Sequence, residues 1–70
     1  MNLTINGELK SIEAKQGTLS LSNLIKQLEH HPLLIVVELN GTILPPGNWD
    51  QQQIHDGDSL EIVTIVGGGS

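Results

Sequence analysis

Two Asn-Gly dipeptides, Asn6-Gly7 and Asn40-Gly41, constrain the fold of this chain more than any other sequence feature. Asn-Gly between strand-like segments is the strongest short-range signal for a two-residue β-hairpin, because both central positions of its turn need a positive φ. Strand-like segments flank both dipeptides, and the strands expected around them span residues 2–5, 8–14, 33–39 and 42–44. The sequence therefore predicts two hairpins.

One helix is expected between the two hairpins. Ser20 is a suitable N-cap, and Pro32 ends the helix because the residue before a proline avoids the helical conformation. Between them, apolar residues recur at the spacing of one helical face: Leu21, Leu24, Ile25 and Leu28. This stripe is expected to pack on an inner sheet face that carries Leu3, Ile5, Leu60 and Ile62.

The second half of the chain is predicted to return to the sheet through an irregular segment. One helical turn is expected around residues 49–52, a tight turn at Asp56-Gly57-Asp58, and a last strand over residues 59–66. Trp49 is the only aromatic residue, and an anchor between this segment and the core is favoured over a partner hot spot.

The two faces of the predicted sheet differ, because one helix covers only one face. Leu9 is expected to point inward, which requires a bulge or a register change near Lys10-Ser11 to bring Ile12 back into phase. The strand over residues 33–39 has apolar residues on both sides, so it is expected to be central and covered twice.

Part of the uncovered face is predicted to be apolar. Val63 and Ile65 are expected to lie on it, beside Ile35 or Val37. An exposed apolar patch of this kind often marks a site for a protein partner.

Composition excludes several classes of function. The 70 residues include no cysteine, and eight acidic residues against three lysines give a net charge of −5. Without cysteine the chain has no disulfide, no thiolate metal ligand and no thiol chemistry. Its acidity makes nucleic acid and anionic membranes poor partners. No signal peptide or membrane span is visible, so a cytoplasmic location is expected.

Two groups of candidate metal ligands favour structural interpretations. His30 and His31 are adjacent, which is poor geometry for one metal ion, so both are expected at a solvated helix end. Asp56 and Asp58 flank a turn glycine without the further oxygen ligands that calcium needs. No metal site is predicted.

The chain ends in Gly67-Gly68-Gly69-Ser70. No helix and no Lys-Ser/Thr pair follows the glycines, so they are not a phosphate-binding loop. Taken alone, they suit a frayed or linker-like terminus and equally a tail that enters a narrow channel and presents its carboxylate. We expect a domain over residues 1–66 and a flexible tail over residues 67–70.

The segment from Asp56 to Gly69 combines a D-G-D turn, an E-I-V strand and a V-G-G-G ending, and Asn40-Gly41 and Trp49 precede it. With these motifs the whole chain resembles the ThiS family, the sulfur carriers of thiamine biosynthesis. The resemblance implies an α+β, ubiquitin-like β-grasp fold in ββαββ order. Its mixed sheet would have four or five strands, with one helix on one face.

The resemblance also implies a carrier rather than an enzyme. A ThiF-like, E1-like adenylyltransferase would use ATP and magnesium to adenylate the C-terminal glycine, and sulfur would then replace AMP to give a thiocarboxylate. A ThiG-like thiazole synthase would accept this sulfur, and the carrier itself would bind no cofactor. The acceptor would be Gly69 if only Ser70 is removed, and Gly68 if the mature end is a bare diglycine.

The residues expected to contact the partners are Val63, Ile65, Val66 and Gly67. Composition agrees with the implied chemistry, because a protein without cysteine can carry sulfur only on a carboxylate. Two alternatives stay open at this point. One is a MoaD-like carrier that supplies molybdopterin synthesis, and the other is a non-catalytic β-grasp interaction module whose glycine tail is incidental.

Overall fold

The computed structural model describes residues 1–65, in which both Asn-Gly dipeptides form the expected hairpins. The backbone φ is 52° at Asn6 and 83° at Gly7, and it is 48° at Asn40 and 91° at Gly41. These left-handed values are those of the hairpin turn that matches the natural twist of paired strands. The elements are β1 (Asn2–Ile5), β2 (Glu8–Ser11), α1 (Leu21–Gln27), β3 (Ile35–Leu39), β4 (Thr42–Leu44) and β5 (Ser59–Thr64).

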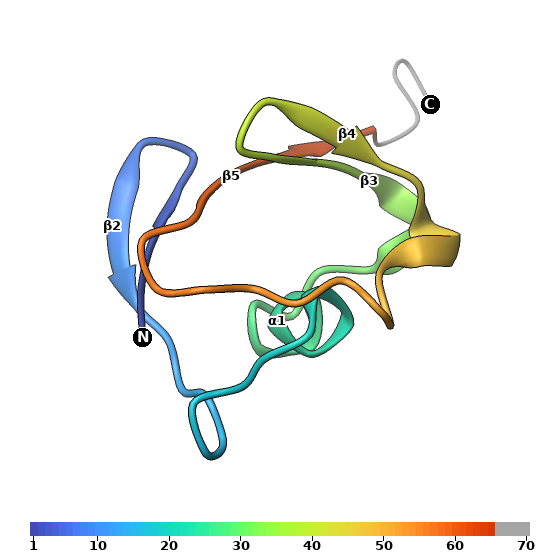
Figure 1. The fold of residues 1–70 in the computed structure, drawn as a ribbon. Coiled ribbons are helices and arrows are strands. Elements are labelled where there is room, and N and C mark those ends of the chain that lie inside the picture. Colours follow the sequence, from blue (N-terminus) through green and yellow to red (C-terminus); the bar gives the residue numbers. More distant parts are fainter. Residues whose placement is uncertain (66–70) are drawn as a thin grey trace.

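The strands form one five-stranded sheet in the order β2-β1-β5-β3-β4. The hairpin pairs and the β3–β5 pair are antiparallel, and β1 and β5 are parallel. In Figure 1 the sheet curves over α1, and the chain between β4 and β5 passes below the sheet. This mixed sheet with one helix on one face confirms the predicted α+β, ubiquitin-like β-grasp fold.

The core lies between the sheet and α1, as the apolar stripe predicted. Leu24 is fully buried and Ile25 is 1% exposed, and both belong to one apolar cluster with the inner sheet face. The predicted sheet members of that cluster are all buried: Leu3, Ile5, Leu60 and Ile62.

Trp49 anchors the irregular segment, as expected. Its side chain is 3% exposed, and its Nε1–H donates a hydrogen bond of 2.9 Å to the carbonyl oxygen of Leu44. A 3-10 turn at Pro46–Asn48 precedes it, so the helical turn expected around residues 49–52 begins earlier in the chain. Within this segment Ile54 is also buried.

β5 is held on both sides by the side chains of the two turn asparagines. Asn6 Nδ2 donates to the Ile62 carbonyl oxygen at 3.1 Å, and the Ile62 amide donates to Asn6 Oδ1 at 2.7 Å. On the other side, the Ser59 amide donates to Asn40 Oδ1 at 2.9 Å, and Asn40 Nδ2 donates to Asp58 Oδ1 at 3.1 Å. The two side chains therefore add hydrogen bonds to those that the backbones of the neighbouring strands make with β5.

The helix begins at the predicted cap but ends earlier than predicted. Ser20 Oγ accepts a hydrogen bond from the Asn23 amide. At the other end, Glu29 has a φ of 60°, its amide donates to the Lys26 carbonyl, and the His30 amide donates to the Ile25 carbonyl. These two bonds form a Schellman motif, which ends the helix before Pro32 has any effect.

The prediction that Leu9 points inward is wrong. The two-residue turn makes Ile5 the partner of Glu8, so Leu9 pairs with Thr4 on the outer face, where it is 76% exposed. Pairing stays regular to the Asn2–Ser11 pair, and Ile12 continues it by exchanging hydrogen bonds with Met1. Neither the predicted bulge nor a register change occurs near Lys10-Ser11, and β2 ends at Ser11.

β3 and β5 also differ from the predicted strands. β3 starts at Ile35, after a 3-10 turn at Pro32–Leu34. Its outer face is not covered a second time, since Val36 is 36% exposed. β5 ends at Thr64, and the rest of the predicted last strand reaches residue 66, which lies outside the described residues. Among the described residues, no helix is long and apolar enough to cross a membrane.

Candidate functional site

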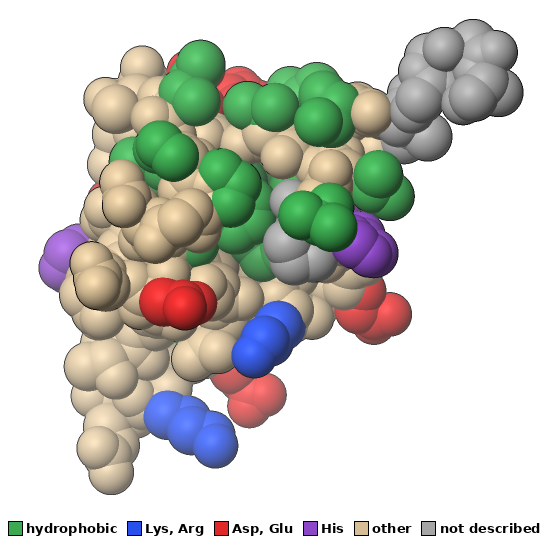
Figure 2. Space-filling model, turned by 90° about the vertical axis from the view of Figure 1, so that its right-hand side faces the viewer, with side chains coloured by type: hydrophobic (Ala, Val, Ile, Leu, Met, Phe, Trp, Pro, Cys, Tyr) green, Lys and Arg blue, Asp and Glu red, His purple; other side chains and the backbone are tan. Residues whose placement is uncertain are grey.

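The sheet face opposite α1, which we call the outer face, carries an exposed apolar patch. It lies on the β3–β4–β5 side of the sheet, and its members are Leu34, Val36, Ile43, Val63 and Ile65. Their exposed fractions run from 36% at Val36 to 63% at Ile43. Figure 2 shows hydrophobic side chains gathered on this part of the molecule.

The patch is built from cross-strand pairs. Val36 lies directly opposite Val63, and one step along, the Ile65 amide donates to the Leu34 carbonyl oxygen at 2.7 Å. Directly opposed β-branched side chains pack against each other on a pleated surface, so the patch has a defined shape before any partner binds. Ile43 extends it from β4.

The structure corrects the neighbours predicted for this patch. Val63 and Ile65 are exposed, as expected, at 57% and 54%. However, Ile35 and Val37 are buried on the inner face, and the outward residues of this part of the chain are Leu34 and Val36. The sequence predicted correctly which residues of the last strand point outward. The register of β3 against β5 could not be predicted, because it does not follow from the pattern of either strand alone.

Two carboxylates continue the outer face beyond the patch. Glu38 on β3 lies directly opposite Glu61 on β5, and Ile43 on β4 lies opposite Glu38. Within residues 1–65 the ion pairs are Lys10–Glu8 and His55–Asp58, so neither Glu38 nor Glu61 has a cationic partner there. The sequence gives both residues, but only the register of β3 against β5 reveals that they face each other.

The remaining predicted site residues lie outside the described residues. They are Val66, Gly67, Gly68 and Gly69, followed by Ser70. β5 leads toward them, since Thr64 and Ile65 lie at the end of the described chain. The apolar patch therefore borders the point where the C-terminal residues begin, and the roles of these residues stay predictions.

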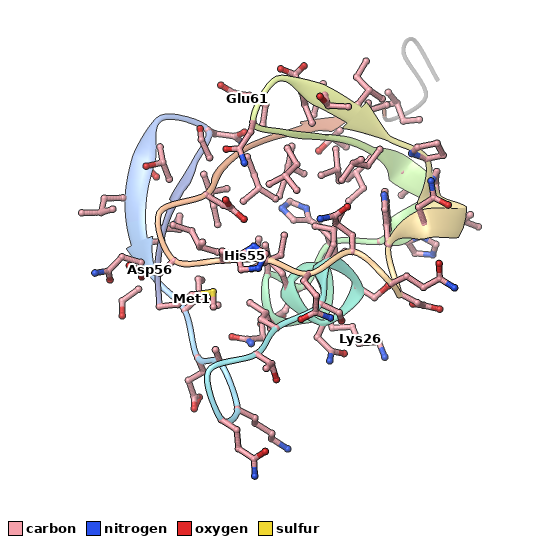
Figure 3. The ribbon with its side chains drawn as sticks, in the orientation of Figure 1. Met1, Lys26, His55, Asp56 and Glu61 are labelled. Atoms are coloured by element: carbon pink, nitrogen blue, oxygen red, sulfur yellow. The ribbon has the colours of Figure 1, made fainter. Side chains whose placement is uncertain are left out.

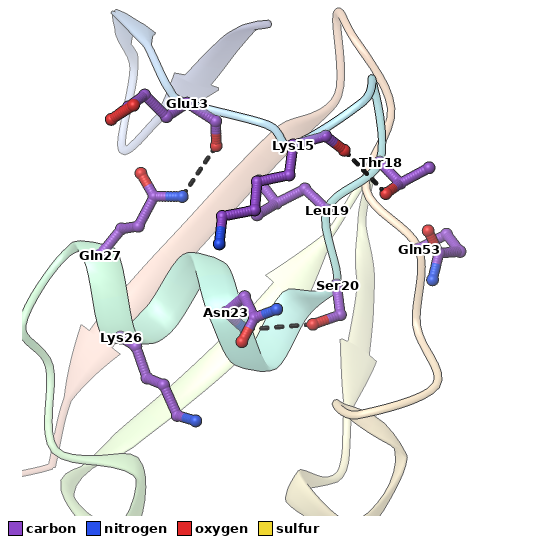
Figure 4. A pocket seen from close by; sticks show the side chains of 9 residues that line it. All are labelled: Glu13, Lys15, Thr18, Leu19, Ser20, Asn23, Lys26, Gln27 and Gln53. Atoms are coloured by element: carbon purple, nitrogen blue, oxygen red, sulfur yellow. Dashed lines mark hydrogen bonds between the residues drawn. The ribbon is translucent and has the colours of Figure 1, made fainter.

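A hollow lies on the helix side of the molecule. It has a volume of about 840 Å³ and is open, and Lys15 and Lys26 contribute to its wall (Figure 4). A smaller hollow of about 250 Å³ lies beside Trp49. Of the predicted site residues that the structure describes, Val63 and Ile65, neither lines either hollow.

The polar groups considered as metal ligands have structural roles. Asp56 Oδ1 accepts from the Asn2 amide at 2.6 Å, and Asp58 Oδ2 accepts from the His55 amide at 2.8 Å, which confirms the turn interpretation. His31 Nδ1 accepts from the Leu33 amide at 3.2 Å, where the chain leaves the helix region. Within residues 1–65 no three His, Asp or Glu side chains gather closely enough to hold a metal ion.

The curved mixed sheet, the single helix and the open apolar sheet face define a small ubiquitin-like β-grasp protein. Comparison with known families makes this more specific. The model of the ThiS family matches residues 3–69, so the chain belongs to the ThiS family, as its sequence motifs predicted.

Solved structures and curated relatives agree with this assignment. The crystal structure of the thiamine biosynthesis protein ThiS from Geobacter metallireducens superposes with a TM-score of 0.83 at 33% identity, covering 99% of this chain and 100% of that chain. An uncharacterized protein, ycf40, from Porphyra purpurea is 38% identical over 69 residues, which is 99% of this chain and 93% of that protein.

One relative is much longer than this chain. A thiazole synthase from Paramagnetospirillum magneticum is 37% identical over 70 residues, which is all of this chain but 21% of that protein. One segment of that thiazole synthase is therefore similar to this entire chain.

Proposed function

We propose that this protein carries sulfur for the synthesis of the thiazole ring of thiamine. The observation that carries the proposal is the family match, which extends from Leu3 through the C-terminal glycines to Gly69. ThiS proteins are small sulfur carriers, so the chain acts as a protein co-substrate in the cytoplasm and other enzymes perform the catalysis. The proposed acceptor is Gly69 once Ser70 is removed, or Gly68 at a bare diglycine end.

The proposed chemistry starts from a glycine carboxylate, which is a poor acyl donor. One carboxylate oxygen attacks the α-phosphorus of ATP, and the bond to pyrophosphate breaks to give an acyl-adenylate. Hydrosulfide then forms a bond to the acyl carbon while the bond to AMP breaks, which leaves a thiocarboxylate, AMP and a proton. ATP and magnesium belong to the ThiF-like adenylyltransferase, and the carboxylate alone holds the sulfur, since the chain has no cysteine.

The apolar patch is the proposed docking surface for this adenylyltransferase. Val63 lies on β5 and Ile65 follows the end of this strand, so docking there would bring the next residues, Val66 and Gly67, to the partner. Side chains would widen the tail, and an all-glycine segment is the narrowest chain that can enter an active site. Apolar side chains at the centre of an interface are typical of specific protein contacts.

A ThiG-like thiazole synthase is the proposed sulfur acceptor. Support comes from the Paramagnetospirillum magneticum thiazole synthase, which contains a segment similar to this whole chain. Joining a carrier to its acceptor enzyme raises their effective concentration, which is useful only if the two meet during the reaction. This relative also favours thiazole synthesis over the MoaD-like alternative.

Exchange of pyrophosphate into ATP by the cognate adenylyltransferase tests the first step. The chain without Ser70 should support exchange at least as well as the chain that keeps Ser70, because its C-terminal carboxylate is that of Gly69, and deletion of residues 67–70 should abolish exchange. Gly68→Val should also abolish exchange at an unchanged melting temperature, because a β-branched side chain restricts and widens the tail.

The product is checked by mass spectrometry after a sulfur donor is added. A carrier gains the mass difference between one sulfur and one oxygen atom, whereas an interaction module gains nothing. If the chain without residues 67–70 still supports exchange, the carrier proposal fails and the interaction module takes its place.

A further inference from the structure

The facing pair Glu38–Glu61 is unfavourable for the isolated protein. Like charges directly opposite each other on neighbouring strands repel and destabilise a sheet. Hydrogen bonds on either side fix the register, since Asn40 donates to Ser59 at 2.8 Å and Ile65 donates to Leu34 at 2.7 Å. The two carboxylates therefore cannot separate by a slip of β3 against β5.

No cation of this chain relieves the repulsion. Lys10 Nζ is 3.8 Å from Glu8 Oε1, and Lys15 and Lys26 line the open hollow on the helix side. Figure 3 shows Lys26 beside α1 and Glu61 on the opposite side of the molecule. The chain has three lysines and no arginine, and none of the ion pairs within residues 1–65 includes Glu38 or Glu61, so a cation that neutralises the pair has to come from another molecule.

The pair is also continuous with the apolar patch. Along β3 and β5, the Val36–Val63 pair comes directly before the Glu38–Glu61 pair, and Ile43 flanks Glu38 from β4. A partner that covers the patch must therefore also cover the edge of the carboxylate pair. Covering two like charges without a counter-charge would oppose binding.

We propose that the partner that covers the apolar patch inserts an arginine side chain between Glu38 and Glu61. This inference rests on the proposed function, in which that partner is the adenylating enzyme. Opposed residues of such a strand pair have Cα atoms about 5.5 Å apart, which leaves room for one planar guanidinium between their carboxylates. Guanidinium groups carry several N–H donors in a fixed fork and suit two acceptors better than an ammonium ion does.

Other occupants of this surface fit less well. A second copy of the chain has no arginine, and its own outer face would bring two more carboxylates. A calcium ion takes six to eight oxygen ligands, and two carboxylates on a sheet surface supply too few. A protein surface that carries a basic side chain next to apolar side chains complements both the Glu38–Glu61 pair and the apolar patch.

The test compares charge-neutral variants in binding and in stability. Glu61→Gln and Glu38→Gln should each weaken binding of the full chain to the cognate adenylating enzyme by about tenfold, as expected for loss of one charged contact in an interface. Their melting temperatures should be equal to or higher than that of the wild type, because the repulsion is removed. The loss of affinity should shrink as salt is raised.

Glu13→Gln is the matched control, since it removes the same charge on the helix side. It should bind like the wild type, and equal weakening by this variant would show a general effect of net charge and overturn the proposal. Wild-type affinity in both outer-face variants would also overturn it, while wild-type pyrophosphate exchange would leave the carrier function intact. If the chain without Ser70 supports no exchange, the carrier function fails, and this inference fails with it.

Discussion

At the scale of single residues, Asn40 and Asp58 form an interaction that needs one amide and one carboxylate. Asn40 Nδ2 donates to Asp58 Oδ1 at 3.1 Å, and Asn40 Oδ1 accepts from the Ser59 amide at 2.9 Å. Asp58 uses its second oxygen to accept from the His55 amide. One amide and one carboxylate therefore tie the second hairpin turn to the start of β5.

Asn40→Asp should destabilise the protein by about 1–3 kcal/mol, because it places two carboxylates together and removes the only donor between them. Exchanging both residues, Asn40→Asp with Asp58→Asn, restores one amide and one carboxylate with the hydrogen bond reversed. The exchange should recover most of the loss at an unchanged net charge. Urea unfolding of the wild type and the two variants measures this, and equal instability of both variants would contradict it.

At the scale of elements, α1 depends on its buried stripe, because a helix of seven residues is too short to be stable alone. Leu24 is fully buried at the centre of this stripe, whereas Asn23 beside it is exposed. An aspartate introduced at each of these two neighbours therefore separates the effect of a buried charge from the effect of aspartate on the helix itself.

Leu24→Asp should unfold the domain, because it buries an unpaired charge in a protein of 70 residues. Domains of this size are stable by only about 4–10 kcal/mol, and the cost of such a charge is of the same order. Asn23→Asp should keep a cooperative melt by circular dichroism. A native melt in the Leu24 variant would mean that this face of α1 is not part of the core.

The elements and their inner faces were predictable because they follow from local patterns. The Asn-Gly turns, the helix stripe and the anchoring role of Trp49 each depend on residues close in sequence. Leu9 was placed wrongly because its hydrophobicity was given more weight than the turn, which fixes the register from Ile5 opposite Glu8. The early helix end was missed because Glu seldom adopts a positive φ.

The candidate site was only half predictable. The alternation of residues along one strand was enough to predict that Val63 and Ile65 are exposed. Their neighbours and the Glu38–Glu61 pair depend on the register between β3 and β5, which are separated in the chain by β4 and the irregular segment. Register between distant strands is set by packing of the whole sheet and by the turns, so no short pattern specifies it.

At the scale of the whole molecule, the two sides of the sheet differ in both charge and polarity. The outer face carries the apolar patch and the Glu38–Glu61 pair, whereas the helix side carries Lys15 and Lys26. Leu9 is also exposed on the outer face, but β2 places it at the opposite edge of the sheet. Leu9 is thus an exposed apolar residue outside the patch, and it offers a control for the specificity of docking.

Val63→Thr should weaken binding to the adenylating enzyme about fivefold, because it replaces one apolar methyl group with a hydroxyl at the centre of the patch. Stability should change little, since the side chain is 57% exposed and remains β-branched. Leu9→Thr should leave binding unchanged. Isothermal titration of both variants with the enzyme checks this, and equal weakening would mean that docking is not confined to the β3–β4–β5 side.

The parallel pairing of β1 with β5 has a mechanical consequence. The chain starts beside β1 and continues beyond the end of β5, so tension between its two ends pulls these neighbouring strands in opposite directions along their length. Their hydrogen bonds, including those made by the Asn6 side chain, then bear the load together instead of breaking one after another. We therefore expect the domain to resist unfolding when its two ends are pulled apart.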